Sequence, residues 1–427
     1  MSRTTTGAGR INRRGLVAGG AAAGLVAATG SRPARRTAAQ EPVTLEFWNT
    51  FSDAEIALLH QFGDEYMAVN PNVKINFFEI PHDQRPTKIP TAVETNTLPD
   101  IIRADYPYQW YLSAAGKLLP LNDRLQGWDM LEGIYPVAWQ EVTTADGQIV
   151  GIPQDKFTSV ICYNADKFAR DGVASFPTTW EEFVDVAKKL THDDEYAISF
   201  QVAGDFSWEL EPLILQGGGR LFDDEGKPTA NTPEAAKGLQ FVTDLVNTYK
   251  VTPPGTVSFA YGEVDDALKS GKVGMGTFGS WQIANYRENK VPFELGIAAW
   301  PAGPGGRGTV SATTMYMVSN TTKHPDEAVA LLKWSVSKEN ALRWATTLDH
   351  EPIDKFTADD PHFQQPIFKA FAESLEFAHV RPRQPRWNAI SAALNEAGQK
   401  AVLQQETPEA TLAEFQSAAE EVVSQGG

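Results

Sequence analysis

Residues 43–80, VTLEFWNTFSDAEIALLHQFGDEYMAVNPNVKINFFEI, decide the fold class of this chain. Residues 43–49 are rich in strand-forming side chains. The following residues place apolar side chains at helical spacing, at Ile56, Leu59, Phe62 and Tyr66. Asn70-Pro71 ends that helix, and a second strand follows at 72–80. With a third strand from Asp100 (DIIRAD), these strand-helix-strand units predict an α/β domain whose parallel sheet is covered on both faces.

The middle of the chain repeats this alternation of strand and helix patterns. Strand-like residues at 151–164 precede a helix in FPTTWEEFVDVAKKL, where Thr178 and Glu181 have the spacing of a capping box. In NTPEAAKGLQFVTDLV, Pro233 stands just inside the start of another helix. The C-terminal part is mainly helical, and no repeat or Ser/Gly linker separates the regions. We therefore expect two α/β regions that are joined by more than one short crossing.

Composition limits the classes of partner. The chain has 427 residues, of which 42% are hydrophobic and 21% charged, so it is long enough for two domains with their own cores. Its net charge is −17, and the first forty residues contain seven arginines and no acid, so the remainder is more acidic still. Such a surface repels phosphate backbones, and we expect neither nucleic acid nor an anionic membrane as a partner.

The N-terminus has the pattern of an export signal. Arg13-Arg14 precedes a Gly/Ala/Val/Leu run at 15–28, which is shorter than the ~20 residues that span a bilayer. The segment resembles a twin-arginine signal, although Asn12 and Leu16 stand where other residues are usual. We expect residues 1–39 to be an export signal and linker, with cleavage possible after Ala39, and the rest of the chain to work outside the cytoplasm.

Metal, redox and cofactor chemistry have little support in the sequence. Cys162 is the only cysteine, so the chain cannot form an internal disulfide, and its apolar surroundings (SVICYN) predict a buried thiol. The seven histidines are scattered without metal-ligand spacing. We therefore expect no metal and no cofactor.

Two glycine-rich stretches match GxGxxG, the pattern of a dinucleotide-binding turn. Residues 303–308 (GPGGRG) precede a strand pattern, which leaves no helix N-terminus for a phosphate. Residues 274–279 (GMGTFG) lie after a strand and before a helix, but deep in the chain and with Trp281 in the first turn of the helix. We expect these glycines to bring the backbone close to a ligand that is not a nucleotide.

A secreted glycoside hydrolase is the alternative class of function. It needs two carboxylates that face each other from separate elements, whereas adjacent acids on one strand or helix diverge. We expect the acidic pairs of this chain to be solvated: Asp193-Asp194, Asp223-Asp224, Asp265-Asp266 and Asp359-Asp360. The serine-hydrolase motif GxSxG is absent.

Six stretches in order give the chain a family resemblance. They are LPDIIRADYPYQWYLSAAGKLLPLND (98–123), GIPQDKFTSVICYNADKF (151–168), FPTTWEEF, ILQGGGRLFDDEGKPTANTPEA (214–235), GKVGMGTFGSW (271–281) and TPEATLAEFQ (407–416). Together they resemble the extracytoplasmic solute-binding proteins of ABC importers, in particular those of the maltose, trehalose and oligosaccharide type. The likeness covers almost all of residues 43–427.

This resemblance implies a periplasmic-binding-protein fold, in which two α/β lobes close on a ligand in the cleft between them. Lobe 1 would comprise residues 40–152 and about 310–348, and lobe 2 would comprise 153–309 and about 349–427. The three hinge crossings would lie near Ile149–Pro153, Val310–Met315 and Thr347–Pro352. The C-terminal helices would pack on lobe 2.

A sugar needs flat apolar platforms and fixed hydrogen-bonding groups, and both occur after predicted strands or near helix starts. The expected ligand-binding residues are Asn49, Phe51, Asp105, Tyr106, Asp155, Phe157, Trp208, Glu209, Gly279, Ser280, Trp281, Thr313, Arg383 and Trp387. The resemblance makes Trp281 and Trp387 stacking platforms, whereas Trp48, Trp110, Trp180 and Trp334 have core patterns. We expect Asp105 and Glu209 to accept from sugar hydroxyls, with Trp208 and Glu209 in a loop. Asp105 could instead cap a helix.

The function implied is that of a receptor, not an enzyme, which delivers a di- or oligosaccharide to the permease subunits of an ABC importer. A monomer is expected. A receptor for a glycerophosphodiester or another polar solute stays open because Arg383 and Lys156 could make the cleft basic. Members of this class often carry a lipid-accepting cysteine after the signal, but Ser31 follows AATG here, so we expect no lipid anchor.

Overall fold

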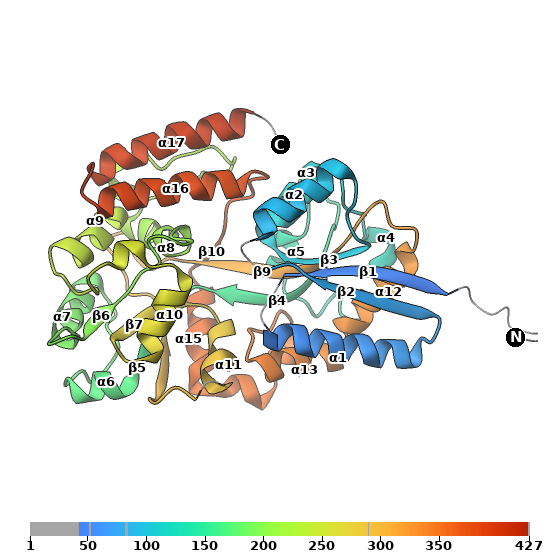
Figure 1. The fold of residues 1–427 in the computed structure, drawn as a ribbon, viewed down its shortest axis with the longest axis horizontal. Coiled ribbons are helices and arrows are strands. Elements are labelled where there is room, and N and C mark those ends of the chain that lie inside the picture. Colours follow the sequence, from blue (N-terminus) through green and yellow to red (C-terminus); the bar gives the residue numbers. More distant parts are fainter. Residues whose placement is uncertain (1–41, 51–52, 82–83, 289, 426–427) are drawn as a thin grey trace, which may run out of the picture. The chain divides into compact units, whose positions relative to one another are not determined.

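The computed structural model of the chain describes residues 42–50, 53–81, 84–288 and 290–425. Its first sheet has the strand order β10-β9-β3-β1-β2, and β4 pairs with β9 outside this path (Figure 1). The strands are β1 (Val43–Asn49), β2 (Val73–Glu79), β3 (Ile101–Asp105), β4 (Ile152–Thr158), β9 (Thr309–Val318) and β10 (Ala378–Val380). The predicted strand-helix-strand units are confirmed, because β1 is parallel to both β2 and β3. The sheet is not parallel throughout, however, since β9 is antiparallel to β3 and β4.

The second sheet has the order β6-β7-β5-β8. Its strands are β5 (Val160–Asn164), β6 (Tyr196–Ile198), β7 (Val273–Phe278) and β8 (Leu295–Ala298). Only the β6-β7 pair is parallel, while β5 runs antiparallel to β7 and β8. Only Ser159 separates β4 of the first sheet from β5 of the second, so the chain passes directly from one sheet to the other at this point.

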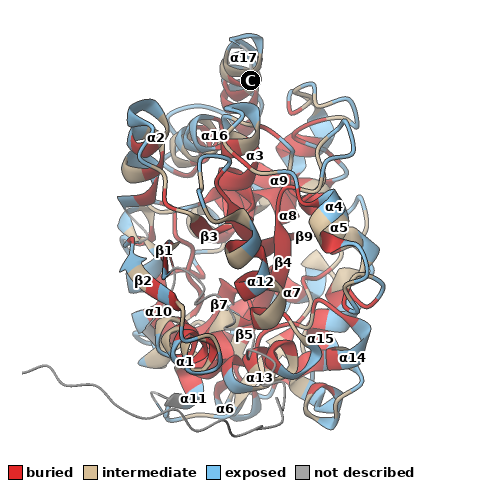
Figure 2. Cartoon of the chain, turned by 90° about the vertical axis from the view of Figure 1, so that its right-hand side faces the viewer, coloured by how far each residue is buried: buried red, intermediate tan, exposed pale blue. Residues whose placement is uncertain are grey.

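Strand β9 is the longest strand of the described residues and pairs with different partners along its length. Its end near Val318 pairs with β3, and its start at Thr309 pairs with β10. Strand β4 runs beside the middle of β9, from the pair Ile152-Tyr316 to the pair Thr158-Ser311. Every residue of β4 and β9 is buried, as Figure 2 shows. Two of the predicted crossings fall on these two strands.

The helices of the N-terminal half are α1 (Asp53–Val69), α2 (Arg85–Thr95), α3 (Tyr106–Ala114), α4 (Asn122–Leu125), α5 (Pro136–Glu141), α6 (Ala165–Arg170), α7 (Trp180–Leu190) and α8 (Ser207–Gly217). Those of the C-terminal half are α9 (Pro233–Asn247), α10 (Tyr261–Lys269), α11 (Trp281–Glu288), α12 (Pro325–Ser335), α13 (Lys338–Leu348), α14 (Lys355–Ala358), α15 (Pro366–Leu375), α16 (Trp387–Val402) and α17 (Pro408–Ser424). No helix of the described ranges is long and apolar enough to cross a membrane.

Local signals set several helix ends. Pro233 occupies the first turn of α9 as predicted, after Thr232, whose side chain accepts from the Ala235 amide. The predicted capping box of α7 is one residue too early: Thr179 is the cap and accepts from the Glu182 amide. The Glu182 carboxylate instead accepts from the amide and hydroxyl of Thr178.

Two large cores hold the sheets and helices together. In one, apolar side chains of β1, α1, α12 and α13 pack together, among them Phe47, Phe62 and Trp344. The other includes side chains of α8, α9, α16 and α17, among them Leu239 and Phe415. Helices α16 and α17 thus pack with α8 and α9, next to each other in Figure 1. Burial of this apolar surface is the main stabilising contribution to such a fold.

Candidate ligand-binding site

Three predicted aromatic residues from three elements form a continuous group. The ring of Trp281, at the start of α11, lies edge-on to Phe157 of β4, with centroids 5.2 Å apart. It also lies 5.7 Å from the ring of Trp208 in α8. The indole Nε1 of Trp281 donates to the Tyr261 hydroxyl at 3.0 Å, and this bond fixes the orientation of the ring. The prediction that Trp281 lies in the first turn of a helix is confirmed.

Arg381 connects this group to the other predicted rings. Its guanidinium lies 5.6 Å from the ring of Trp208, 4.9 Å from that of Trp387 and 5.5 Å from that of Tyr106. Trp387 opens α16 as predicted, and its ring lies 6.2 Å from that of Tyr106 at the start of α3. The structure therefore brings together predicted residues from α3, α8, α11, α16 and β4.

Sequence reasoning missed Arg381 and chose Arg383 in the same stretch. Arg381 is 5% exposed and is ion-paired with the Glu211 carboxylate through Nε at 2.7 Å. Its Nη2 donates to the Ser207 hydroxyl at 2.7 Å. Arg383 is exposed and lies 5.6 Å from the ring of Trp110. Both arginines lie in RPRQPRW, a segment without regular spacing, so no local pattern could decide which of them is buried.

The predicted turn at Gly279 joins β7 to α11. A Cβ at Gly279 would overlap the ring of Trp281, so glycine allows this ring to lie over the turn. The other glycines of the GxGxxG match lie inside β7, where a Cβ at Gly276 would come within 2.6 Å of the ring of Phe278. Only one glycine of the pattern is therefore at the turn, and the other two serve packing. This arrangement differs from a dinucleotide-binding turn, in which the glycines lie in the loop.

Several buried polar groups of the predicted set have no hydrogen-bond partner among the described residues. They are Nδ2 of Asn49, the hydroxyls of Tyr106, Ser280 and Thr313, Nε1 of Trp208 and Oδ1 of Asp155. The Thr314 hydroxyl, which was not predicted, shares this property. A buried polar group without a partner costs about 1–3 kcal/mol, so such groups mark places where bound molecules complete the hydrogen bonding. Of these seven groups, all but the Asp155 oxygen are uncharged.

The predicted carboxylates differ in their surroundings. Asp105 forms an ion pair with Arg85, in which Nη1 of Arg85 lies 2.8 Å from Oδ1 of Asp105. The Asp105 side chain is 30% exposed. It precedes α3 but makes no capping hydrogen bond, so the helix-cap alternative is wrong. Asp155 is buried and accepts from Nε1 of Trp344 at 2.8 Å. Burial raises the pKa of Asp155, but the hydrogen bond and charge of His350 and the charge of Arg103 lower it more. The pKa of Asp155 is therefore held below its usual value.

Glu209 does not lie in a loop as predicted, but in the first turn of α8 with Trp208. Its carboxyl is fully buried and accepts from the amide of Gln201 at 3.0 Å and from the hydroxyl of Thr277. Burial raises the pKa of Glu209 to about 8, against the lowering effect of these hydrogen bonds. These contacts point the carboxyl into the protein interior.

Two further predictions concern Phe51 as a ligand-binding residue and Asp265 as a solvated acid. Phe51 lies outside the described residues. Asp265 is not solvated, since it is 8% exposed, pairs with Lys269 at 2.6 Å and accepts from Gln282. It lies on α10 and faces α11, a contact that no short stretch of sequence reveals.

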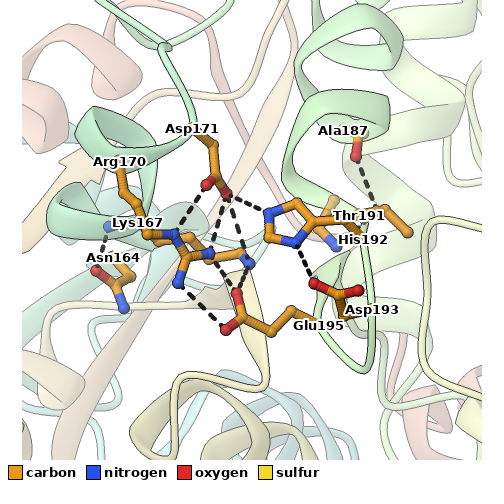
Figure 3. A network of polar contacts seen from close by, with 10 residues as sticks. Asn164, Lys167, Arg170, Asp171, Ala187, Thr191, His192, Asp193 and Glu195 are labelled. Carbon is orange, nitrogen blue, oxygen red and sulfur yellow. Dashed lines mark hydrogen bonds and ion pairs between the residues drawn. The ribbon is translucent and has the colours of Figure 1, made fainter.

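Two clusters contain the residue types of a metal site, Glu55-Asp155-His350 and Asp171-His192-Glu195. In the first, Nη2 of Arg103 lies 2.9 Å from Glu55 and 3.4 Å from Asp155. In the second, the carboxylates pair with Lys167 and Arg170, as Figure 3 shows. Because cationic side chains already neutralise these carboxylates, we assign both clusters to ion-pair networks.

Comparisons with known proteins agree with this architecture. The family model of bacterial extracellular solute-binding proteins matches residues 52–342. The maltotriose-binding protein of Pyrococcus abyssi is 22% identical over 367 residues, which cover 82% of this chain and 76% of the relative. The arabinooligosaccharide-binding protein of Halalkalibacterium halodurans is 25% identical over 348 residues, covering 76% of this chain and 73% of the relative.

A solved structure shows the same fold. The GacH receptor of Streptomyces glaucescens, known unliganded and in complex with acarbose, superposes with a TM-score of 0.81 at 21% identity. The match covers 91% of this chain and 100% of the receptor. The predicted two-lobed α/β fold is therefore confirmed. This chain belongs to the family of bacterial extracellular solute-binding proteins.

Proposed function

We propose that this protein is an extracytoplasmic receptor that binds a di- or oligosaccharide and delivers it to the permease of an ABC importer. The observation that carries the proposal is the aromatic group of Phe157, Trp208 and Trp281, joined through Arg381 to Trp387. Rings of this kind pack against the C–H faces of sugars. Relatives that bind maltotriose and arabinooligosaccharides support this choice of ligand class.

The charge distribution also favours a neutral ligand. Apart from Oδ1 of Asp155, whose other carboxylate oxygen pairs with Arg103, the unpartnered buried groups of the predicted set are uncharged hydroxyl, amide and indole groups. Lys156, which could have made the cleft basic, is 2% exposed and pairs with Glu141 at 2.8 Å. The buried guanidinium of Arg381 is neutralised by Glu211. A phosphodiester would need a buried cation without an acidic partner, so we rank it below a sugar.

We propose that binding, and not bond cleavage, is the function of the site. Hydrolysis of a glycosidic bond needs one carboxyl as an acid and a second that faces it. Asp105 pairs with Arg85, Asp155 belongs to the Arg103 network and the Glu209 carboxyl points inward. Incubation with candidate glycosides at high protein concentration should give no product; turnover would contradict this part of the proposal.

Stacking on Trp281 and Trp387 is the part of the proposal that mutation tests most directly. Trp281→Ala and Trp387→Ala should each weaken binding of the tightest sugar by ~1–3 kcal/mol, measured by calorimetry after a thermal-shift screen of di- and oligosaccharides. Trp334→Ala is the matched control, because Trp334 is partly buried in the other core, against Phe62 and Tyr66. Unchanged affinity in both site variants would refute the assignment.

We further propose the lobe boundaries and hinge crossings given above, with a monomeric chain that avoids nucleic acid. Strand β4 of the first sheet leads into β5 of the second, and β9 of the first sheet follows β8 of the second, which supports the first two crossings. Small-angle scattering should show compaction when the tightest sugar saturates the protein, and no compaction with any bound sugar would contradict hinge closure.

We also propose that residues 1–39 are a twin-arginine export signal, which agrees with membership of an extracellular family. A reporter fused to this segment should leave the cytoplasm. The double variant Arg13→Lys, Arg14→Lys should keep the reporter in the cytoplasm. Export of the double variant would contradict the route.

A further inference from the structure

Glu209 lies where three segments of the candidate site meet. Its carboxyl accepts from the amide of Gln201, in the segment after β6, and from the hydroxyl of Thr277, the last but one residue of β7. Its own backbone belongs to the first turn of α8, directly after Trp208. Thr277 in turn lies four residues before Trp281. One buried side chain therefore connects the segments that carry the two adjacent indole rings.

We infer that Glu209 is a positioning residue that ties the first turn of α8 to the end of β7, and so fixes the separation of the Trp208 and Trp281 rings. The inference rests on the proposed function, because it assumes that these rings contact the ligand. It also replaces the earlier expectation that Glu209 accepts directly from a sugar hydroxyl. The 5.7 Å between the ring centroids is the distance that this tie maintains.

No cation among the described residues pairs with Glu209, unlike the buried Asp155 and Glu211, which pair with Arg103 and Arg381. Asp205, in the segment before α8, is the charged group that acts on it, and it is also negative. Strand β7 and residues 199–204 contribute no charged side chain. The charged groups of the packed helices have other partners: Glu211 pairs with Arg381, Asp265 with Lys269, and Lys400 with Glu396 and Glu414.

Protonation of this carboxyl should therefore control the tie. In the neutral form the carboxyl fits a buried site without a counter-ion, whereas ionisation would place an uncompensated charge in the core. Burial raises the pKa of Glu209 to about 8, so the change falls in an accessible pH range. Above that pH we expect water to reach the carboxylate and the first turn of α8 to loosen, which separates Trp208 from Trp281.

The first test needs no ligand. Tryptophan emission and near-UV circular dichroism of the full chain, recorded on both sides of pH 8, should change with a midpoint near the pKa of about 8. Glu209→Gln keeps the size and an acceptor oxygen but cannot ionise, so its signal should be flat across this range. Thr277→Val removes a hydrogen bond that favours the ionised form, so it should move the midpoint to higher pH. Trp208→Phe should abolish the signal, because it removes one indole of the pair.

Glu211→Gln is unsuitable as a control because Glu211 pairs with Arg381 in the site, and Glu234→Gln on the exposed side of α9 serves instead. It should titrate like the wild type. Identical titrations of the wild type and Glu209→Gln, or a midpoint that Thr277→Val leaves unchanged, would overturn the inference.

The second test measures affinity for the tightest sugar found in the screen. If only the protonated form binds, raising the pH from about 7 to about 9 should weaken wild-type binding about tenfold, by the fraction of competent protein. Glu209→Gln should bind with the same affinity at both pH values. If the affinity for a sugar falls by the same factor between these pH values in the wild type and in Glu209→Gln, the inference is overturned while the proposed function stays intact. If no sugar binds at all, the proposed function fails, and the ligand-free titration still decides the role of Glu209.

Discussion

Asp155 and Glu209 are both completely buried carboxyls in the candidate site region, yet their proton affinities shift in opposite directions. Asp155, on β4, is surrounded by Arg103, His350 and the indole N–H of Trp344, and its pKa is held below the usual value. Glu209, on α8, receives hydrogen bonds only from uncharged groups, and burial raises its pKa to about 8.

Because both carboxyls are equally buried, the difference shows that the charges nearby decide in which direction the pKa of a buried acid shifts. Around Asp155 the protein holds a charged network with Arg103 at its centre, which also contacts Glu55. Such a network tolerates the loss of its cation poorly, because Arg103 is the cation that bridges its two buried carboxylates. The Glu209 site should tolerate a neutral amide, because its acid is itself neutral below pH 8.

Removal of Arg103 should destabilise the protein most, because Arg103 is the cation of the network around Asp155. Arg103→Met fills much of the same volume but removes the guanidinium that bridges the buried Glu55 and Asp155 carboxylates, and we expect a loss of about 3–5 kcal/mol in the free energy of unfolding. Urea denaturation monitored by circular dichroism measures it. Arg124→Ala is the control, since Arg124 pairs with the exposed Asp326 and should cost about 1 kcal/mol or less. Equal losses in both variants would show that the Arg103 network is not a buried ion-pair system.

The raised pKa of Glu209 should make the stability of the protein depend on pH. A carboxyl whose pKa is raised in the folded state keeps its proton there while the unfolded chain releases it, so stability falls as the pH rises from about 4.5 towards the folded pKa. Burial gives this behaviour to Glu209, with a pKa of about 8, and to Glu351, with a pKa of about 7. Between about pH 6 and pH 7.5 the wild type should therefore lose about 2 kcal/mol relative to Glu209→Gln, at about 1.4 kcal/mol per pH unit.

Glu351 supplies the internal control for that measurement. It accepts from the amide and hydroxyl of Thr158 at 2.6 Å each and makes no contact with Glu209. Glu351→Gln should reduce the fall of stability with pH only up to about pH 7, whereas Glu209→Gln should reduce it up to about pH 8. Parallel curves for the wild type and Glu209→Gln between pH 6 and pH 7.5 would show that Glu209 is ionised in the folded protein.

Much of the fold could be predicted because it depends on local patterns. The β1-α1-β2 unit follows from the strand and helix spacing at 43–80, and the start of α9 follows from Thr232 and Pro233. Trp281 and Trp387 were placed correctly at helix starts for the same reason. The antiparallel β9 could not be predicted, because its partners β3 and β4 lie far away in the chain.

The chemistry of the site was less accessible for a physical reason. The roles of Asp155, Glu209 and Arg381 depend on partners that come from distant segments, such as His350 for Asp155 and Glu211 for Arg381. Sequence shows which residues carry charge, but the pairing of those charges is decided by tertiary contacts. That is why Glu209 was expected to contact a ligand, whereas its carboxyl faces Gln201 and Thr277.

A third kind of acid sharpens the comparison and should give the smallest effect. Glu195 has cationic partners, Lys167 and Arg170 (Figure 3), but one third of its side chain is exposed to solvent. Hydrogen bonds from Arg170 and Lys167 lower its pKa to about 2, so its contribution is present above about pH 4.5 and is lost as the pH falls towards 2. Because solvent screens the pairs, Glu195→Gln should cost about 1 kcal/mol or less at neutral pH, and high salt should reduce that cost. Thermal unfolding at pH 7 and pH 3, with and without salt, measures it against Glu234→Gln, whose carboxylate lies 3.8 Å from Lys237 on an exposed helix face. A loss as large as that of Arg103→Met would mean that exposure does not weaken these pairs, and the charge inventory alone would then account for all three acids.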